Sequence, residues 1–256
     1  MLFSPVENAN IGAENHVADV DLEIADGLAV ITIDRPQARN AIAPTTMDEL
    51  EKAIEAAEGA RALVIRGAGD RAFVSGGDLK ELSALRTHEE AAAMAWRMRG
   101  ICDQIAAFPA PVVAALNGHA LGGGAEVAVA ADIRIAADDI KIGFNQVSLA
   151  IMPAWGGAER LAALVGRGRA LMLAGSGTIL QAAEAERVGL IDRVYSRETF
   201  EEGWRSLGAA LANPAAADIK RVVSGATPDE AVDAFARLWI ADEHWAAADR
   251  VMNKGK

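Results

Sequence analysis

The sequence predicts an α/β protein, because short apolar segments with strand character alternate with longer segments of helical periodicity along residues 1–197. Two further observations support this class. Glycines cluster directly behind two of the apolar segments, where a strand leads into a helix, and residues 198–256 carry helical patterns. We therefore expect strands joined by crossing helices, followed by a C-terminal helical region.

The expected elements follow one another in a regular order. Apolar runs such as 28–33 and 61–66 have the length of buried strands, and Thr46 and Glu49 have the spacing of a capping box at a helix start. In chain order we expect strands 21–24 and 28–33, helix 45–58, strand 61–66, helix 88–108, and strands 111–116, 132–136 and 141–144. Beyond Pro153 we expect helices 158–165, 169–174 and 181–188, a strand 192–195, and a helical tail with breaks at Pro214 and Pro228.

Composition limits the classes of partner. A chain of 256 residues, 52% of them hydrophobic, is long enough to bury a sizeable core. Its formal net charge of −11 counts against nucleic acid, because phosphate binding needs clustered Lys and Arg. No apolar run has the length of a membrane span and no secretory signal precedes the first strand, so we expect a cytoplasmic protein without a membrane partner. The single cysteine, Cys102, cannot form an internal disulfide, and no residue cluster has the spacing of metal ligands.

The run Asn117–Glu126 is the most informative segment of the chain. The glycines at 122–124 follow an apolar segment and precede a predicted helix, and Glu126 comes just behind them. Glycine has no Cβ and the first amides of a helix have no internal partner, so these N–H groups can approach a bound carbonyl oxygen. Glu126 adds a carboxylate that can act as an acid or a base. A tight packing turn is the alternative interpretation of the glycines.

A second glycine-rich turn, Ser75-Gly76-Gly77-Asp78, follows the strand predicted at 61–66 and also precedes a helical pattern. One amide from each turn can converge on a single carbonyl oxygen and stabilise the negative charge that it gains during a reaction. Removing one such donor typically costs about 3 to 4 kcal/mol of transition-state stabilisation. The two turns together therefore predict an oxyanion site.

Four motifs occur in this chain in one order: Ile31–Pro36 with Asn40-Ala41, then Ala72–Leu79, Asn117–Glu126 and Pro153–Gly157. As a set they resemble the crotonase (enoyl-CoA hydratase/isomerase) superfamily, and the resemblance covers nearly the whole chain. It implies a spiral of stacked ββα units over residues 1–197, and a helical region over 198–256 that covers the active site or joins a homotrimer or a dimer of trimers. It also implies an enzyme that binds acyl-CoA thioesters and stabilises an enolate with the amides of Gly77 and Gly123.

The resemblance further implies where coenzyme A is held. Coenzyme A is anionic, so cations must gather near the site of this acidic chain. The positions that match cofactor contacts of the family are Arg39, Ala41, Ser75, Gly77, Asp78, Leu79, Lys80 and Gly123. We interpret Arg71 as an ordinary solvated charge and Asp78 as a helix cap that orders the loop. No cofactor is expected beyond the coenzyme A carried in the substrate thioester.

The chain departs from the hydratases of the family at Asn145-Gln146, where they carry a Pro-Glu pair. Hydratases of the family use two glutamates to add water across a C=C bond, and Gln146 cannot ionise. Its amide can still take part in catalysis by holding a water molecule or a substrate carbonyl through hydrogen bonds. Losing a general acid or base typically lowers the rate about 10² to 10⁴-fold. Glu126 is then the one acid that a motif assigns to the site, which leaves hydration, isomerisation and decarboxylation as alternatives. In many isomerases of the family, however, the working glutamate corresponds to position 146.

Part of the chain is similar to ethylmalonyl-CoA decarboxylases of the superfamily, which also lack the second glutamate. The similarity lies in residues 120–126 and in the stretch from Lys141 to Gly157. Trp155, close behind Pro153, is expected in the substrate pocket, where a bulky ring shortens the acyl site or excludes water; packing against the following helix is the alternative. A catalytically degraded protein that binds acyl-CoA or RNA is the remaining hypothesis, and the acidic charge counts against RNA.

Overall fold

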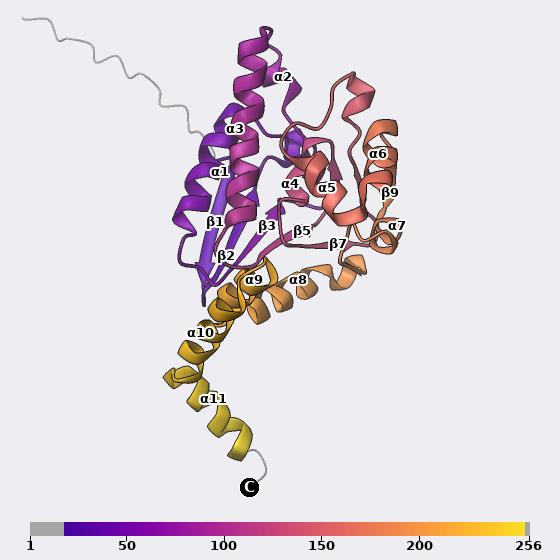
Figure 1. Ribbon diagram of the computed structural model, residues 1–256. Helices are drawn as coiled ribbons and strands as arrows, with labels where there is room; N and C mark the ends of the chain where they lie inside the picture. Colours follow the sequence, from indigo (N-terminus) through magenta and orange to yellow (C-terminus); the bar gives the residue numbers. More distant parts are fainter. Residues whose placement is uncertain (1–17, 254–256) are drawn as a thin grey trace, which may run out of the picture.

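Two β-sheets form the centre of the protein in the computed structural model, which describes residues 18–253 (Figure 1). The larger sheet has six strands in the order β1-β2-β3-β5-β7-β10. β1 runs antiparallel to β2, and the other neighbours are parallel. These strands are β1 (Val20–Ala25), β2 (Leu28–Ile33), β3 (Ala62–Gly67), β5 (Val112–Leu116), β7 (Ile133–Ala137) and β10 (Arg193–Tyr195). All six were predicted to within two residues of their ends.

The smaller sheet has four strands in the order β4-β6-β8-β9, namely β4 (Ala72–Val74), β6 (His119–Leu121), β8 (Lys141–Gly143) and β9 (Ile179–Gln181). β4, β6 and β8 are parallel, and β9 is antiparallel to β8. Only β8 was predicted, because three-residue strands are too short to show a period of two, and β6 lies inside a glycine-rich run. The two sheets and their crossing helices confirm the α/β class and the crotonase-like arrangement.

The helices of the core cover the sheets and match the predicted segments within a few residues. α1 and α3 pack against each other at one side of the large sheet, and α5 and α6 pack together on the opposite side of the molecule (Figure 1). Of the helices in residues 18–253, none is long and apolar enough to cross a membrane. The core helices are α1 (Pro44–Ala56), α2 (Leu79–Leu82), α3 (His88–Ala107), α4 (Gly123–Ala128), α5 (Gly157–Val165), α6 (Arg167–Ser176) and α7 (Ala182–Arg187), with short 3₁₀ turns η1 (Pro36–Ala38) and η2 (Gln146–Leu149).

The capping box predicted at the start of α1 is wrong. The helix begins at Pro44, so Thr46 is its third residue, and the hydroxyl of Thr46 accepts a hydrogen bond from the Ala43 N–H at 3.2 Å. The same hydroxyl donates to Asp19 at 2.7 Å, and the Glu49 carboxylate accepts from the Val20 N–H at 2.9 Å. Both side chains therefore join α1 to the start of β1.

The C-terminal helices fall into two groups. α8 (Arg197–Leu211) packs on β3, β7 and β10, and it buries Phe200 and Trp204 as predicted. α10 (Pro228–Trp239) and α11 (Asp242–Asn253) extend away from the sheets (Figure 1). α9 (Ala216–Val223) stays beside them, where Lys220 pairs with Asp132 at 2.7 Å and donates to the carbonyl of Ala110 at 3.2 Å. Packing is the role that the sequence predicts for the aromatic residues of this region, and the remaining ones pack on one another: the ring centroid of Trp239 lies 5.5 Å from that of Phe235 and 5.6 Å from that of Trp245. They stay outside the core, with exposed fractions of 62% for Phe235 and 46% for both Trp239 and Trp245.

Candidate active site

The two glycine-rich turns lie at the same edge of the small sheet. β4 and β6 are parallel neighbours, so the turns that follow their carboxyl ends come together there. A Cβ added to Gly76 would lie 3.3 Å from the backbone nitrogen of Gly123, which measures how closely the turns approach. The structure thus brings together the two segments that the sequence assigned to one site.

The amides of Gly77 and Gly123 are available to a ligand. The Ile42 N–H donates to the Gly76 carbonyl and the Asp78 N–H donates to the Ile42 carbonyl, each at 2.8 Å, which holds the chain on both sides of Gly77. Gly123 is the first residue of α4, where an amide has no partner within the helix. Within residues 18–253, neither amide donates to an acceptor of the protein. Both are free donors at the predicted oxyanion site.

The indole ring of Trp155 covers the two glycines. A Cβ on Gly123 would overlap its six-membered ring, and a Cβ on Gly77 would lie 3.8 Å from Cζ2 of the ring. Trp155 is 7% exposed, and Pro153 two residues earlier is also buried. The ring therefore fills space beside both amides in this conformation.

Glu126 is buried behind the glycines at the amino end of α5, with 2% of its surface exposed. Its Oε2 accepts hydrogen bonds from the Trp155 N–H at 2.8 Å and the Gly157 N–H at 3.0 Å. Its Oε1 accepts from Nε2 of Gln146 at 2.9 Å. A Cβ on Gly157 would overlap the Glu126 side chain, so a glycine at this position allows the close approach.

Burial raises the pKa of Glu126 above its ordinary value, although the amides of Gly157, Trp155 and Gln146 act in the opposite direction. A carboxylate offers about four lone-pair sites. Oε2 has both of its sites occupied by backbone amides, whereas Oε1 keeps one after its bond with Gln146. Oε1 therefore keeps more acceptor capacity than Oε2 for a water molecule or a proton.

Gln146 is the first residue of η2 and is 7% exposed. Its Oε1 is buried and has no hydrogen-bond partner among the described residues. An unpartnered buried acceptor costs about 1 to 3 kcal/mol and calls for an explanation. The amide next to Glu126 thus presents an acceptor that a ligand can satisfy.

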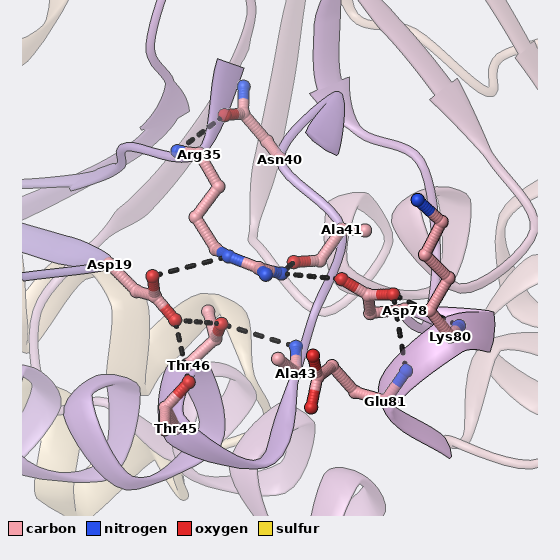
Figure 2. Close-up of polar contacts among 10 residues, drawn as sticks. All are labelled: Asp19, Arg35, Asn40, Ala41, Ala43, Thr45, Thr46, Asp78, Lys80 and Glu81. Atoms are coloured by element: carbon pink, nitrogen blue, oxygen red, sulfur yellow. Dashed lines mark hydrogen bonds and ion pairs between the residues drawn. The ribbon is translucent and has the colours of Figure 1, made fainter. Parts of the chain in front are cut away.

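Asp78 caps α2, as predicted: its Oδ1 accepts from the N–H groups of Lys80 at 3.1 Å and Glu81 at 3.5 Å. Its Oδ2 accepts from the Arg35 guanidinium at 3.0 Å, a contact that the sequence did not reveal (Figure 2). Burial acts to raise the pKa of Asp78, but the bonds from Arg35, Glu81 and Lys80 hold it below the ordinary value. Leu79, between Asp78 and Lys80, is 64% exposed.

A cavity of about 560 Å³ opens beside Ser75, and its lining holds three arginines and two aspartates, Asp70 and Asp139, of which Asp139 pairs with Arg197. Arg39 and Arg71 both line this cavity. The sequence alone indicates an ordinary solvated charge at Arg71, whereas the structure places this residue in the same cavity as Arg39. Arg197 also lines it, and it donates to the carbonyl of Asn117 at 2.6 Å. No sequence signal pointed to Arg197, because it lies 80 residues from Asn117. Of the other expected cofactor contacts, Ala41 is buried and its carbonyl accepts from Arg35 at 2.5 Å.

Comparison with known proteins identifies the family. The family model described as "Enoyl-CoA hydratase/isomerase" matches residues 23–234. The chain is 39% identical over 175 residues to a "Probable enoyl-CoA hydratase" of Bacillus subtilis (strain 168), covering 67% of each protein. It is 40% identical over 186 residues to the "Crotonyl-CoA hydratase" of Syntrophomonas wolfei, covering 70% of each. A crystal structure of an enoyl-CoA hydratase from Bacillus anthracis superposes with a TM-score of 0.85 at 28% identity, covering 92% of this chain and 96% of that one. The chain therefore belongs to the enoyl-CoA hydratase/isomerase family of acyl-CoA enzymes.

Proposed function

We propose that the protein hydrates a short-chain 2-enoyl-CoA thioester and that Glu126 is its one acid–base group. The observation that carries the proposal is the pair of neighbouring acceptors, Oε1 of Glu126 with one open site and Oε1 of Gln146 with no partner. A water molecule has two O–H donors and can satisfy both. Similarity to a crotonyl-CoA hydratase supports the same reaction.

The reaction follows from these contacts. The thioester carbonyl oxygen accepts hydrogen bonds from the amides of Gly77 and Gly123, and water donates to Glu126 and Gln146. The water oxygen bonds to C3, the C2=C3 electrons move to the carbonyl oxygen as an enolate, and Glu126 takes the water proton. Collapse of the enolate then draws that proton from Glu126 to C2. The amides are most valuable while the oxygen carries charge, because they need no reorganisation then.

Trp155 limits the space that is available to the acyl group of the substrate. Its ring lies beside Gly77 and Gly123, and Oε1 of Gln146 is sealed from solvent in this conformation. We place the indole at the end of the acyl site, on the Cβ side of both glycines. A ring in this place favours a short acyl chain over a long one.

Coenzyme A itself is proposed to occupy the cavity lined by Arg39 and Arg71. Its phosphates are anionic, and within a chain of net charge −11 the cavity offers Arg39 and Arg71 besides Arg197, which is paired with Asp139; Asp70 is the other carboxylate of the lining. Ser75 also lines it and stands two residues before Gly77, so the cavity adjoins the oxyanion site.

Arg71→Ala should raise KM for crotonyl-CoA about tenfold and leave kcat within twofold, because a charge-assisted hydrogen bond contributes about 1.5 to 3 kcal/mol. Steady-state kinetics at two salt concentrations measures this, and the difference should shrink at high salt. Arg187→Ala, an exposed arginine at the end of α7, is the matched control and should change neither constant. An unchanged KM for Arg71→Ala would show that the phosphates bind elsewhere.

Decarboxylation of a short 2-carboxyacyl-CoA is the second candidate, and the raised pKa of Glu126 favours it. Loss of CO₂ needs an oxyanion site but no base, and a neutral Glu126 would then protonate the enolate. A protonated Glu126 would also remove the repulsion that its carboxylate exerts on a substrate carboxylate. Gln146, being uncharged, adds no such repulsion.

Product mass separates these reactions. The purified protein is incubated with crotonyl-CoA, a 3-enoyl-CoA and ethylmalonyl-CoA in separate tubes, and the products are analysed by mass spectrometry. Gain of one water from crotonyl-CoA is the expected result. Loss of CO₂ from ethylmalonyl-CoA without hydration would replace the hydratase proposal, and a shifted double bond at constant mass would favour isomerisation.

The partner that we propose besides the substrate is another copy of the chain. α10 and α11 extend away from the sheets, and together with α9 they expose apolar residues that a monomer would leave in water: Val223, Val232, Phe235, Ile240 and Val251. Light scattering coupled to size exclusion should give a mass above that of one chain. Phe235→Glu, which puts a charge on this surface, should lower that mass, and a monomeric wild-type protein would rule the partner out.

A further inference from the structure

We propose that Arg35 is a positioning residue that holds the Gly77 loop in place through Asp78. The proposal rests on the proposed function, in which the Gly77 amide stabilises the enolate. Arg35 follows β2, and its guanidinium reaches the candidate site at Asp78 and at the carbonyl of Ala41. Its guanidinium binds three segments at once: Asp19 at 3.2 Å, the Ala41 carbonyl at 2.5 Å and Asp78 at 3.0 Å (Figure 2).

Arg35 is well held on the side away from the loop. Oδ1 of Asp19 pairs with Nε of Arg35, and Oδ2 of Asp19 accepts from the hydroxyls of Thr45 at 2.8 Å and Thr46 at 2.7 Å. Both threonines belong to the first turn of α1. The guanidinium is thus fixed to the large sheet and to α1, and only 14% of its side chain is exposed.

The loop needs such support because it has little packing of its own. α2 has four residues, of which Leu82 alone packs partly buried against the core, and Gly77 has no side chain. Asp78 supplies the connection: Oδ2 binds Arg35, Oδ1 binds the amides of α2, and its N–H donates to Ile42. Since Asp78 directly follows Gly77, fixing its carboxylate and its N–H restricts the direction of the Gly77 amide.

Removing the guanidinium changes this arrangement in a predictable way. The carboxylates of Asp19 and Asp78 are 12% and 13% exposed, and without Arg35 they lose their shared counter-ion. Each would move toward water, and Asp78 would take the loop with it. The Gly77 amide would then be displaced from the developing charge, while the arginine-lined cavity beside Ser75 stays intact.

Arg35→Met should lower kcat for crotonyl-CoA about 10- to 100-fold and leave KM within threefold. Complete loss of one oxyanion donor lowers kcat about 10²- to 10³-fold, and this variant displaces the donor without removing it. Arg35→Lys should recover part of kcat, since one ammonium can pair with Asp78 but cannot span all three partners. Arg97→Met is the matched control: Arg97 links Asp48 and Glu51 on α1 to α3, away from the glycines, and its loss should lower Tm without lowering kcat.

Two further measurements separate a positioning role from a structural one. Calorimetry compares butyryl-CoA with coenzyme A: wild type should prefer the thioester, and Arg35→Met should lose that preference while binding coenzyme A as before. Asp78→Asn should lower kcat in the wild type and have a much smaller effect in the Arg35→Met background, because both substitutions break the same ion pair between Arg35 and Asp78.

An Arg35→Met protein with normal kcat and a lower Tm would reduce the residue to a structural role. Weaker binding of coenzyme A with unchanged kcat would make Arg35 a cofactor contact, and the proposal would also be wrong. A wrong proposed function would give a different result. The wild-type protein would then turn over none of the thioesters and would not bind butyryl-CoA more tightly than coenzyme A, and both proposals would be wrong.

Discussion

Glu126→Gln should lower kcat for crotonyl-CoA hydration about 10² to 10⁴-fold, which is the usual cost of removing a general acid or base. The amide has the shape of the carboxylate, and its oxygen can still accept from the N–H groups of Trp155 and Gly157. It cannot take a proton from water or return one to C2. KM should therefore stay within threefold of the wild-type value. The loss of kcat is measured by stopping the reaction at set times and quantifying the hydrated product by mass spectrometry.

Glu202→Gln, an exposed glutamate on α8, is the control for this change and should keep wild-type kcat. The pH dependence gives a second readout. Hydration needs ionised Glu126, so wild-type kcat/KM should fall tenfold for each pH unit below the pKa of Glu126, which burial raises above its ordinary value. The variant should lack this inflection. A Glu126→Gln protein with wild-type kcat would leave Glu126 only the role of capping α5.

The sequence alone predicts the large sheet well, because its longer strands are continuous apolar runs. β3 and β5 show this: Leu63 to Ile65 and Val112 to Leu116 are at most 1% exposed. The small sheet is different. β4, β6 and β9 have three residues each, and their pairing depends on neighbours far along the chain. No local period distinguishes such strands from turns.

The same distinction holds for the candidate site. A glycine cluster followed by a carboxylate is a local pattern, and in the structure Gly77, Gly123 and Glu126 all lie next to Trp155. The groups that set the chemistry of Glu126 are not local: the amides of Trp155 and Gly157 lie 29 and 31 residues away. Nearly every residue type carries a backbone N–H group, so the identity of a residue does not show whether its N–H binds Glu126. The sequence therefore could not reveal these hydrogen bonds.

Charged residues show a further limit. Arg35 and Arg71 have the same side chain and both flank predicted loops, yet one is held by three partners and the other lines a cavity. Their surroundings come from segments brought together by the fold. Asp19, the partner of Arg35, is 8% exposed although aspartate is mostly a surface residue. Burial of this kind depends on tertiary contacts that composition does not encode.

Gly123→Ala should have the second large effect: alanine keeps the N–H, but displacing this amide from the carbonyl oxygen should lower kcat/KM by up to about 10²-fold, the usual cost of a lost oxyanion donor. A Cβ at this position overlaps the ring of Trp155, so the ring or the start of α4 must move. Overpacking of this kind costs about 1 to 3 kcal/mol of unfolding free energy. Denaturant titration measures the stability, and initial rates with crotonyl-CoA measure the activity.

Gly100→Ala is the control, because a Cβ at this position in α3 meets no atom within 4 Å. It should keep full activity and raise the unfolding free energy by about 0.5 to 1 kcal/mol through the helix preference of alanine.

The double variant Gly123→Ala/Trp155→Ala then tests the cause. Trp155→Ala alone should cost about 3 to 5 kcal/mol of unfolding free energy by leaving a cavity. The new methyl group partly fills that cavity. The double variant should therefore lose about 0.5 to 3 kcal/mol less unfolding free energy than the two single variants lose in total. Simple additivity would mean that the ring does not limit the space at Gly123, and the proposed preference for short acyl chains would lose its physical basis.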